Sequence, residues 1–511
     1  MRFRRGAVVG APALAMLVLG LWGVDRGGMW RDEAVTFQVA RRTVPQIWRL
    51  LHGVDAVHGL YYLLMHCVLA VRADEVVLRL PSVAGAAVTA GLVAEVGARL
   101  ARPRVGLWAG LLYAVNPMAG HYAQEGRSYA LVAAGAMAAT LLLLRGVEKG
   151  SWWGYGLVLG VTCWLHEFAV LLVLAHGVTL ALARVGARVW RGWGCAAVAA
   201  GAAVVPMALV SRAQAAQVAW LRRPTAGTAE GLLRSFFGVS PGVYWVCLGL
   251  AAVGAAGMSG GRGKVTLAGV ALPLTVVAPG VLMLVSLSSP PLYVDRYVLY
   301  ALAGAPLAVA AGAERVVAWP ARTGRPGGRF RPRPPSVPVT LLGLLAVALV
   351  LLQQLPVLRQ DRDPARRPDD LASVARAAAR GVRAGDAVLY LPGSARNTAL
   401  AYPGAFSGTR DLALAEPGAR SGTLYGVEAP AGEVRRRLDG VARVWVVADR
   451  AVLTGRWTPH SAVVRTELAV LRQEFRVAGE AVRGRDAVRL YVRPVSYRGG
   501  PVPSPPRPAR W

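Results

Sequence analysis

The sequence has little of what marks a soluble or disulfide-linked protein. Only 17% of its 511 residues are charged, against roughly 25% in typical soluble domains. Lysine occurs only twice, as Lys149 and Lys264. The cysteines stand singly in apolar stretches with no CxxC spacing, which indicates neither a disulfide framework nor a zinc site. These cysteines are Cys67, Cys163, Cys195 and Cys247.

The positive charge does not indicate a nucleic-acid-binding protein. The net charge of +30 comes almost entirely from arginine, and many of these arginines lie in short segments between apolar runs. No motif typical of nucleic-acid recognition accompanies them. In a membrane protein, arginine-rich short loops mark the cytoplasmic side instead. We therefore expect no nucleic-acid partner.

Long apolar runs are abundant, and 55% of the residues are hydrophobic. A helix of about 20 apolar residues crosses a bilayer core of about 30 Å. The runs predict a mostly α, polytopic membrane bundle of about eleven transmembrane helices. The segment 60–71 is too short to cross and is expected to lie at the membrane surface. The predicted spans are 6–24, 78–98, 105–121, 128–144, 152–165, 167–183, 193–211, 241–258, 265–287, 297–313 and 338–355.

The basic residues between spans predict the orientation in the cell membrane. If the N-terminus is cytoplasmic and segment 60–71 does not cross, every cytoplasmic loop is basic. An odd number of spans then places the C-terminus outside the cell. The basic residues of these loops include Arg99, Arg102, Arg104, Arg145, Lys149, Arg184, Arg188, Arg191, Arg262 and Lys264.

A change in composition after residue 355 predicts a second kind of domain. Hydropathy falls there, and helical patterns alternate with short β-type runs, which predicts a soluble α/β domain outside the membrane. We expect a transmembrane domain at 1–356, the α/β domain at 357–493 and a disordered Pro/Arg-rich tail at 494–511. The expected elements are helices at 371–382, 433–441 and 461–475 and strands at 387–391, 442–448 and 487–492.

Five polar clusters fall on the predicted outer face. Each has a structural explanation by itself: Asp32 and Glu33 could begin a solvated helix, and Glu125 and Arg127 could form an interfacial ion pair. The orientation was derived from arginines in other loops, so the convergence of the clusters indicates an outward-facing polar site. The clusters are residues 30–34, Asp55 with His58, residues 121–129, His166 with Glu167, and residues 293–297.

Together these groups suit sugar transfer from a lipid phosphate. A carboxylate can act as general base on an acceptor hydroxyl. Arginines can bind a phosphate leaving group through forked hydrogen bonds. A second carboxylate could orient the acceptor or hold a divalent metal ion, and no cluster has a ligand spacing that decides between these roles.

At these residues the sequence resembles the GT-C superfamily of membrane glycosyltransferases. It looks most like glycosyltransferase family 39, which is related to protein O-mannosyltransferases and to the aminoarabinose lipid A transferase. The sequence departs from the family pattern at Gly59 and Leu60, where two prolines are usual, and at Gly126, where alanine is usual. The resemblance is carried by Asp32-Glu33 and by the stretches 55–64, 78–82 and 122–130.

The resemblance implies a GT-C-type bundle that uses a polyprenyl-phosphate-linked sugar, such as mannose, as donor. The acceptor would be a glycan, a glycolipid or a protein, and transfer would invert the anomeric carbon. Asp32 would be the base, Glu33 would support it, and Glu125 would position the acceptor or a metal ion. The donor phosphate would be held by Arg127, Arg296 and His58.

Two other functions stay open. A lipid-linked sugar transporter or flippase would use a similar bundle, but coupled transporters usually carry ionisable residues inside the membrane. Most of the predicted spans have none near their centres. A non-catalytic envelope-assembly protein is the second alternative, and the intact Asp32-Glu33 pair argues against it.

Overall fold

The computed structural model describes residues 5–322, 337–367, 369–494 and 509–510. The chain divides into two compact units. The first consists of Met1–Val24, Asp55–Tyr61 and Arg79–Asp361, and the second of Asp25–Val54, Tyr62–Leu78 and Arg362–Trp511. Most of the predicted tail, and residues 323–336 before the last predicted span, lie outside the described residues.

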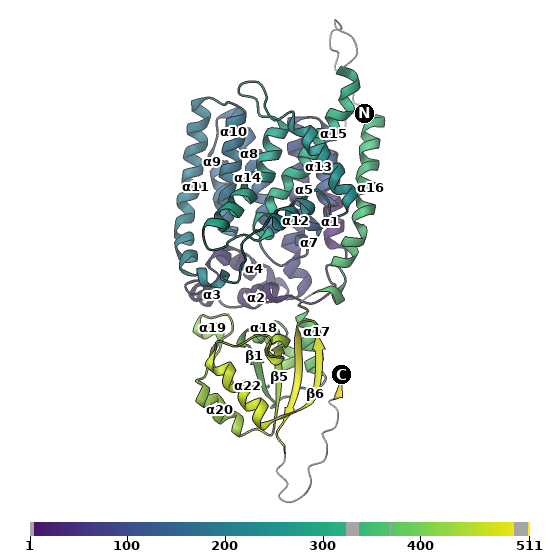
Figure 1. Cartoon of the computed structure of the whole chain (residues 1–511). Helices are drawn as coiled ribbons and strands as arrows, with labels where there is room; N and C mark the ends of the chain where they lie inside the picture. The colour runs from purple at the N-terminus through teal and green to yellow at the C-terminus, as the bar shows by residue number, and fades with distance from the viewer. Residues whose placement is uncertain (1–4, 323–336, 368, 495–508, 511) are drawn as a thin grey trace, which may run out of the picture. The chain divides into compact units, whose positions relative to one another are not determined.

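The first unit is a bundle of helices (Figure 1). Four 3₁₀ segments among the described residues, labelled η, interrupt or extend them. Residues 75–78 of helix α5 belong to the second unit and its remaining residues to the first. The elements are α1 (Arg5–Leu21), η1 (Ala56–His58), α5 (Glu75–Leu100), α6 (Pro103–Ala114), α7 (Pro117–Ala123), α8 (Tyr129–Lys149), α9 (Trp153–Leu165), η2 (Glu167–Leu171), α10 (Leu172–Leu182), α11 (Ala187–Ala213), η3 (Ala215–Val218), α12 (Ala226–Phe237), α13 (Pro241–Ala255), α14 (Leu267–Ser288), η4 (Asp295–Ala303), α15 (Gly304–Arg322) and α16 (Val337–Asp361).

Every predicted span falls on helix, but the helices differ in length. Among the described residues, six are long and apolar enough to cross a membrane, and α12 with α13, bent by 86°, would make a seventh. The shorter apolar helices α1, α9 and η2–α10 do not reach that length. The membrane bundle is therefore confirmed, and the total of eleven crossings stays a prediction. The six helices are α5, α8, α11, α14, η4 continued by α15, and α16.

The predicted span 105–121 is divided into α6 and α7. Pro117 cannot continue the hydrogen-bond ladder of a preceding helix, but it fits the first turn of a new one. The side chain of Asn116 caps that turn by accepting hydrogen bonds from Met118 N at 2.8 Å and Ala119 N at 3.3 Å. The local sequence therefore ends one helix and begins another within one apolar run.

Small residues set how closely the helices approach. A Cβ added to Gly106 of α6 would lie 2.2 Å from the carbonyl oxygen of Ala94 on α5. One added to Gly312 of α15 would lie 1.8 Å from the carbonyl oxygen of Leu250 on α13. Helices in lipid associate largely through such close backbone packing. These two contacts require glycine.

The second unit combines the first loop with an α/β domain. The loop supplies α2 (Arg31–Ala40), α3 (Val44–Leu51) and most of α4 (Gly59–Val71). The domain elements are η5 (Pro364–Arg366), α17 (Leu371–Ala379), β1 (Ala387–Leu391), η6 (Gly393–Arg396), α18 (Asn397–Ala401), η7 (Pro403–Phe406), β2 (Arg410–Asp411), β3 (Leu414–Glu416), α19 (Gly418–Ser421), β4 (Val427–Glu428), α20 (Ala431–Asp439), β5 (Arg443–Asp449), α21 (Arg450–Leu453), α22 (Ala462–Glu474), β6 (Arg476–Arg483), β7 (Asp486–Val492) and β8 (Ala509–Arg510).

The main sheet has the strand order β2-β1-β5-β7-β6-β8. Strand β1 is parallel to β2 and β5, and β7 is antiparallel to β5 and β6. All three predicted strands and all three predicted helices of this domain are present, which confirms the α/β prediction. Strand β6 was not predicted, because a register shift between Val477 and Gly479 breaks its alternation.

Strand β1 shows why the domain has two cores. Successive side chains of a strand point to opposite faces of the sheet. Leu389 and Leu391 pack into a core that includes residues of α20 and α22. Val388 and Tyr390 pack into a second core that includes residues of α17. The sheet is therefore covered by helices on both faces, and every residue of β1 is buried.

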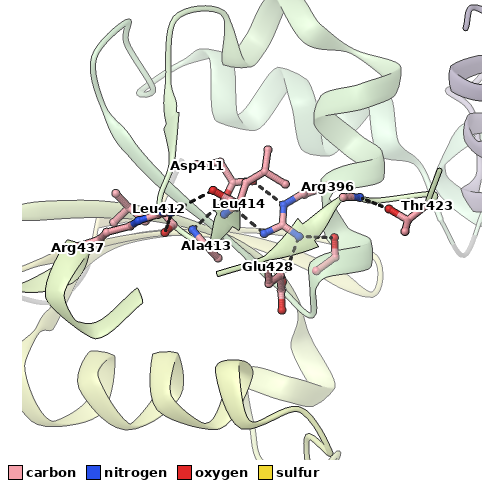
Figure 2. A network of polar contacts seen from close by, with 10 residues as sticks. Arg396, Asp411, Leu412, Ala413, Leu414, Thr423, Glu428 and Arg437 are labelled. Carbon is pink, nitrogen blue, oxygen red and sulfur yellow. Dashed lines mark hydrogen bonds and ion pairs between the residues drawn. The ribbon is translucent and has the colours of Figure 1, made fainter. Parts of the chain in front are cut away.

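A polar network lies beside the first of these cores (Figure 2). Arg396 donates hydrogen bonds to Asp411 Oδ2 at 2.5 Å and to Glu428 Oε1 at 3.1 Å. Glu467 is fully buried nearby, and neither of its carboxyl oxygens has a hydrogen-bond partner among the residues that the structure describes. Burial, and then the charge of Glu428, raise the pKa of Glu467 well above its ordinary value, although Arg396 opposes them. Its surroundings therefore favour the protonated acid over the carboxylate.

Replacing Glu467 tests this burial. Because its pKa is raised on folding, the wild-type protein should lose stability as the pH rises above the ordinary glutamate pKa, by up to about 1.4 kcal/mol per pH unit until the raised value is reached. Glu467→Gln removes this linkage. We expect the variant's advantage in thermal unfolding temperature, measured on the full chain in detergent, to grow from about pH 5 to about pH 8.

The matched control is Glu416→Gln, because Glu416 is an exposed glutamate of the same domain. It should follow the wild type at both pH values. A Glu467→Gln protein with the same pH dependence as the wild type would contradict the protonated, buried state.

Candidate active site

The predicted acidic pair lies at the start of α2, in the second unit. Glu33 is fully buried, and its Oε2 accepts a long hydrogen bond of 3.4 Å from Trp30 N. A glutamate at this position caps the orphan N–H groups of a helix start. Asp32 is partly exposed on the same turn. The pair is thus divided between one buried carboxyl that supports the helix and one that reaches the surface of the unit.

The other four predicted residues lie in the first unit, where His58 and Arg127 are in direct contact. Arg127 Nη2 lies 2.6 Å from His58 Nε2, and both residues are buried. A guanidinium can only donate hydrogen bonds, so Nε2 must accept and the imidazole proton sits on Nδ1. The structure therefore brings together two residues that are far apart in the sequence.

His166 extends this pair into a cluster. Its ring lies 6.2 Å from that of His58 and 4.7 Å from that of Tyr297, between ring centroids. It is buried at the junction of α9 and η2, and within the described part of the chain its Nδ1 has no hydrogen-bond partner. An unsatisfied buried nitrogen is costly unless a ligand or water completes it.

Both imidazoles are neutral near pH 7. Burial lowers the pKa of His166 to about 3, with further contributions from Arg127 and Arg296. Burial, followed by the charges of Arg127, His166 and Arg296, lowers the pKa of His58 well below its usual value. The positive charge of the cluster thus comes from the two guanidinium groups, while the histidines supply neutral hydrogen-bonding groups.

The segment around Arg296 joins the cluster through aromatic and polar contacts. Arg296 lies over the ring of Tyr297 at 5.8 Å, and Tyr297 lies 6.3 Å from the ring of Tyr129 on α8. Asp295 Oδ1 accepts a hydrogen bond of 2.8 Å from Arg296 N and lies 3.5 Å from Tyr122 OH. These contacts tie η4 to α7 and α8, and they leave the Arg296 side chain partly exposed.

The turn that carries Glu125 and Arg127 is fixed from two sides. Ser82 Oγ on α5 lies 2.6 Å from Glu125 O and 3.0 Å from Arg127 O. Gln124 Nε2 donates to Gly20 O and Trp22 O, each at 2.8 Å, at the end of α1. The buried Glu125 and Arg127 side chains are therefore held by a backbone that two other helices keep in place.

The structure thus gathers His58, Glu125, Arg127 and Arg296 within one unit and places Asp32 and Glu33 in the other. Sequence reasoning had named His166 as part of a polar cluster but gave it no role. It also did not anticipate the part of Ser82 in holding the turn, although Ser82 stood in a family motif. Among the described residues, no group of three or more His, Cys, Asp or Glu side chains is arranged to hold a metal ion.

The arrangement is suited to binding an anion. Two arginines can bind phosphate oxygens through charge-assisted hydrogen bonds. Neutral imidazoles add donors without the cost of burying more charge. The aromatic rings of Tyr129 and Tyr297 enclose the imidazole of His166.

A protein-family model covers part of this bundle. Residues 59–213 match the family described as dolichyl-phosphate-mannose-protein mannosyltransferase. This range includes Arg127 and His166 but neither Asp32 nor Arg296. No curated protein sequence matches the chain significantly.

Solved structures match nearly the whole chain. ArnT from Cupriavidus metallidurans in the apo state has a TM-score of 0.59 at 12% identity, over 94% of this chain and 97% of ArnT. ArnT bound to undecaprenyl phosphate has a TM-score of 0.56 at 12% identity, over 97% and 100%. The Archaeoglobus fulgidus oligosaccharyltransferase tethered with an acceptor peptide has a TM-score of 0.51 at 11% identity, over 94% and 73%.

These likenesses concern the fold, because the sequence identities are low. They extend across both the helical bundle and the α/β domain of this chain. The apolar helices and the family match agree with them. The resemblance predicted from the sequence is therefore confirmed: this chain is a multi-pass membrane protein with the fold of the GT-C superfamily of membrane glycosyltransferases.

Proposed function

We propose that this protein is an integral membrane glycosyltransferase that moves a sugar from a polyprenyl-phosphate donor to an acceptor hydroxyl on the extracytoplasmic side. The observation that carries the proposal is the buried His58–Arg127 pair, with Arg296 and His166 beside it. The similar fold of ArnT, one structure of which is bound to undecaprenyl phosphate, supports a lipid phosphate as the ligand of these residues.

The arginines act on the leaving group. As the bond from the anomeric carbon to the phosphate oxygen breaks, its electron pair moves onto the phosphate. Arg127 and Arg296 neutralise the charge that develops there, which is the usual way in which preorganised donors lower a barrier. His58 orients the guanidinium of Arg127, because its Nε2 accepts a hydrogen bond from that group.

Asp32 acts on the acceptor. Its carboxylate takes the proton of the acceptor hydroxyl as the oxygen attacks the anomeric carbon from the face opposite the phosphate. One carbon–oxygen bond forms while the other breaks, so the configuration inverts. Polyprenyl phosphate leaves with the electron pair, and the proton stays on Asp32 until solvent removes it. Glu33 supports the helix turn that carries Asp32, and Glu125 positions the acceptor.

Asp32→Asn tests the base. The amide keeps the size of the side chain but cannot accept the proton, so transfer should fall by about 100-fold or more. Sugar transfer would be measured with purified protein and a labelled polyprenyl-phosphate sugar. Asp25→Asn is the control, because Asp25 is an exposed aspartate of the same loop. An active Asp32→Asn protein would overturn the assignment.

Arg296→Gln tests the phosphate site. Arg296 is partly exposed, so its loss should leave the bundle folded. A lost charge-assisted hydrogen bond is worth about 1.5–3 kcal/mol, which predicts a rise of about ten- to a hundredfold in KM for the donor. Arg127→Gln should act in the same direction.

The control for the phosphate site is Arg222→Gln, which removes an exposed arginine of the same unit. Its KM should match the wild type. If Arg296→Gln and Arg127→Gln both bind the donor normally in a folded protein, these residues do not hold the phosphate.

Movement of labelled donor across the membrane of sealed vesicles, without any sugar transfer, would instead favour a flippase.

A further inference from the structure

Helix α2, which carries Asp32 and Glu33, is attached at both ends to the C-terminal α/β domain, and all of these elements belong to the second unit. At its N-terminal end, Tyr402 OH accepts a hydrogen bond of 2.8 Å from Met29 N, and Asn397 Nδ2 donates one of 2.9 Å to Arg31 O. At its C-terminal end, Arg42 donates to Thr423 O at 2.9 Å and to Leu424 O at 3.1 Å. The position of the helix therefore depends on this domain.

Arg31 is the charged part of this attachment. Its guanidinium lies 3.3 Å from Asp449, 3.5 Å from Asp369 and 3.6 Å from Asp486. The side chains of Asp369 and Asp486 are only 7% and 9% exposed, so the Arg31 charge compensates carboxylates that water hardly reaches. Asp32 follows Arg31 directly in the chain, and any shift of Arg31 therefore moves Asp32.

Two of the three aspartates that Arg31 contacts lie side by side at one edge of the sheet. Asp449 ends β5, and Asp486 lies opposite it at the start of β7. In open α/β sheets this carboxyl edge of the parallel strands is where ligands usually bind. Here the edge receives an arginine from the first loop of the same chain.

The aspartates depend on Arg31 in turn. The pKa of Asp486 is raised to about 6, because burial and the charges of Asp369 and Asp449 outweigh the opposing charges of Arg31 and Arg485. Oδ2 of Asp486 and Oδ1 of Asp369 have no hydrogen-bond partner within the described residues. The Arg31 guanidinium therefore stabilises all three carboxylates from the one position in which it lies near each of them.

We propose that Arg31 is a positioning residue for the transfer reaction: the carboxylates of Asp369, Asp449 and Asp486 hold it, and the α/β domain thereby fixes Asp32 for its role as base. This inference rests on the proposed function, because it requires Asp32 to act on the acceptor. It gives the α/β domain a part in catalysis through the three aspartates that hold Arg31.

The experiment compares Arg31→Gln with Arg31→Lys in the full-length protein. Arg31→Gln should lower kcat by about tenfold or more, since a misplacement of about 1 Å can cost about 100-fold. The KM for the donor should stay unchanged, because the phosphate is held by other residues. Arg31→Lys keeps the charge and should restore part of kcat, which a purely structural defect would not do.

Coupling to the aspartates gives a second readout. Asp449→Asn should lower kcat by itself but add little in the Arg31→Gln background, because both changes remove the same contact. Arg443→Gln is the control. Arg443 begins the strand that Asp449 ends, and it pairs with Asp386 at 2.7 Å, so its loss removes an ion pair of the same domain at the opposite edge of the sheet.

The outcomes separate this inference from the proposed function. If Arg31→Gln retains the wild-type kcat while Asp32→Asn is inactive, Arg31 does not position the base and the function still stands. If the effects of Arg31→Gln and Asp449→Asn simply add, or if Arg443→Gln lowers kcat as much, the contact has no special part and the inference is overturned.

Discussion

The proposed phosphate site depends on the buried hydrogen bond between Arg127 and His58. A buried guanidinium is costly unless its N–H groups find acceptors. Here one acceptor is a neutral imidazole, which satisfies a donor but leaves the positive charge in place. The histidine therefore satisfies a buried donor of a guanidinium group, and guanidinium groups bind phosphate oxygens well.

Much of the architecture follows from the sequence. Apolar run length predicts the membrane helices, and alternation predicts β1, β5 and β7 in the α/β domain. The joining of His58 and Arg127 was expected because the arginines of the other loops placed both on one face. What periodicity cannot show is where a run is interrupted, as at Asn116 and Pro117, or where a bulge shifts a strand, as in β6.

The least predictable parts are contacts between distant segments. The inclusion of His166 depends on how the junction of α9 and η2 packs against Tyr129 and Tyr297, which no local pattern encodes. In the sequence, nothing distinguishes Arg31 from the other arginines that lie in loops. Its three aspartate neighbours follow it by more than 300 residues, and only the folded second unit brings them together. Local spacing cannot predict a contact of this kind.

We propose above all that His58, Arg127, His166 and Arg296 together recognise the phosphate of a polyprenyl carrier. The most direct measurement compares the affinity of the purified wild-type protein for polyprenyl phosphate with its affinity for the uncharged polyprenol of the same chain length. We expect tighter binding of the phosphate by about tenfold or more, because at least one charge-assisted hydrogen bond is gained. Equal affinities would show that only the lipid chain is bound and would contradict the account.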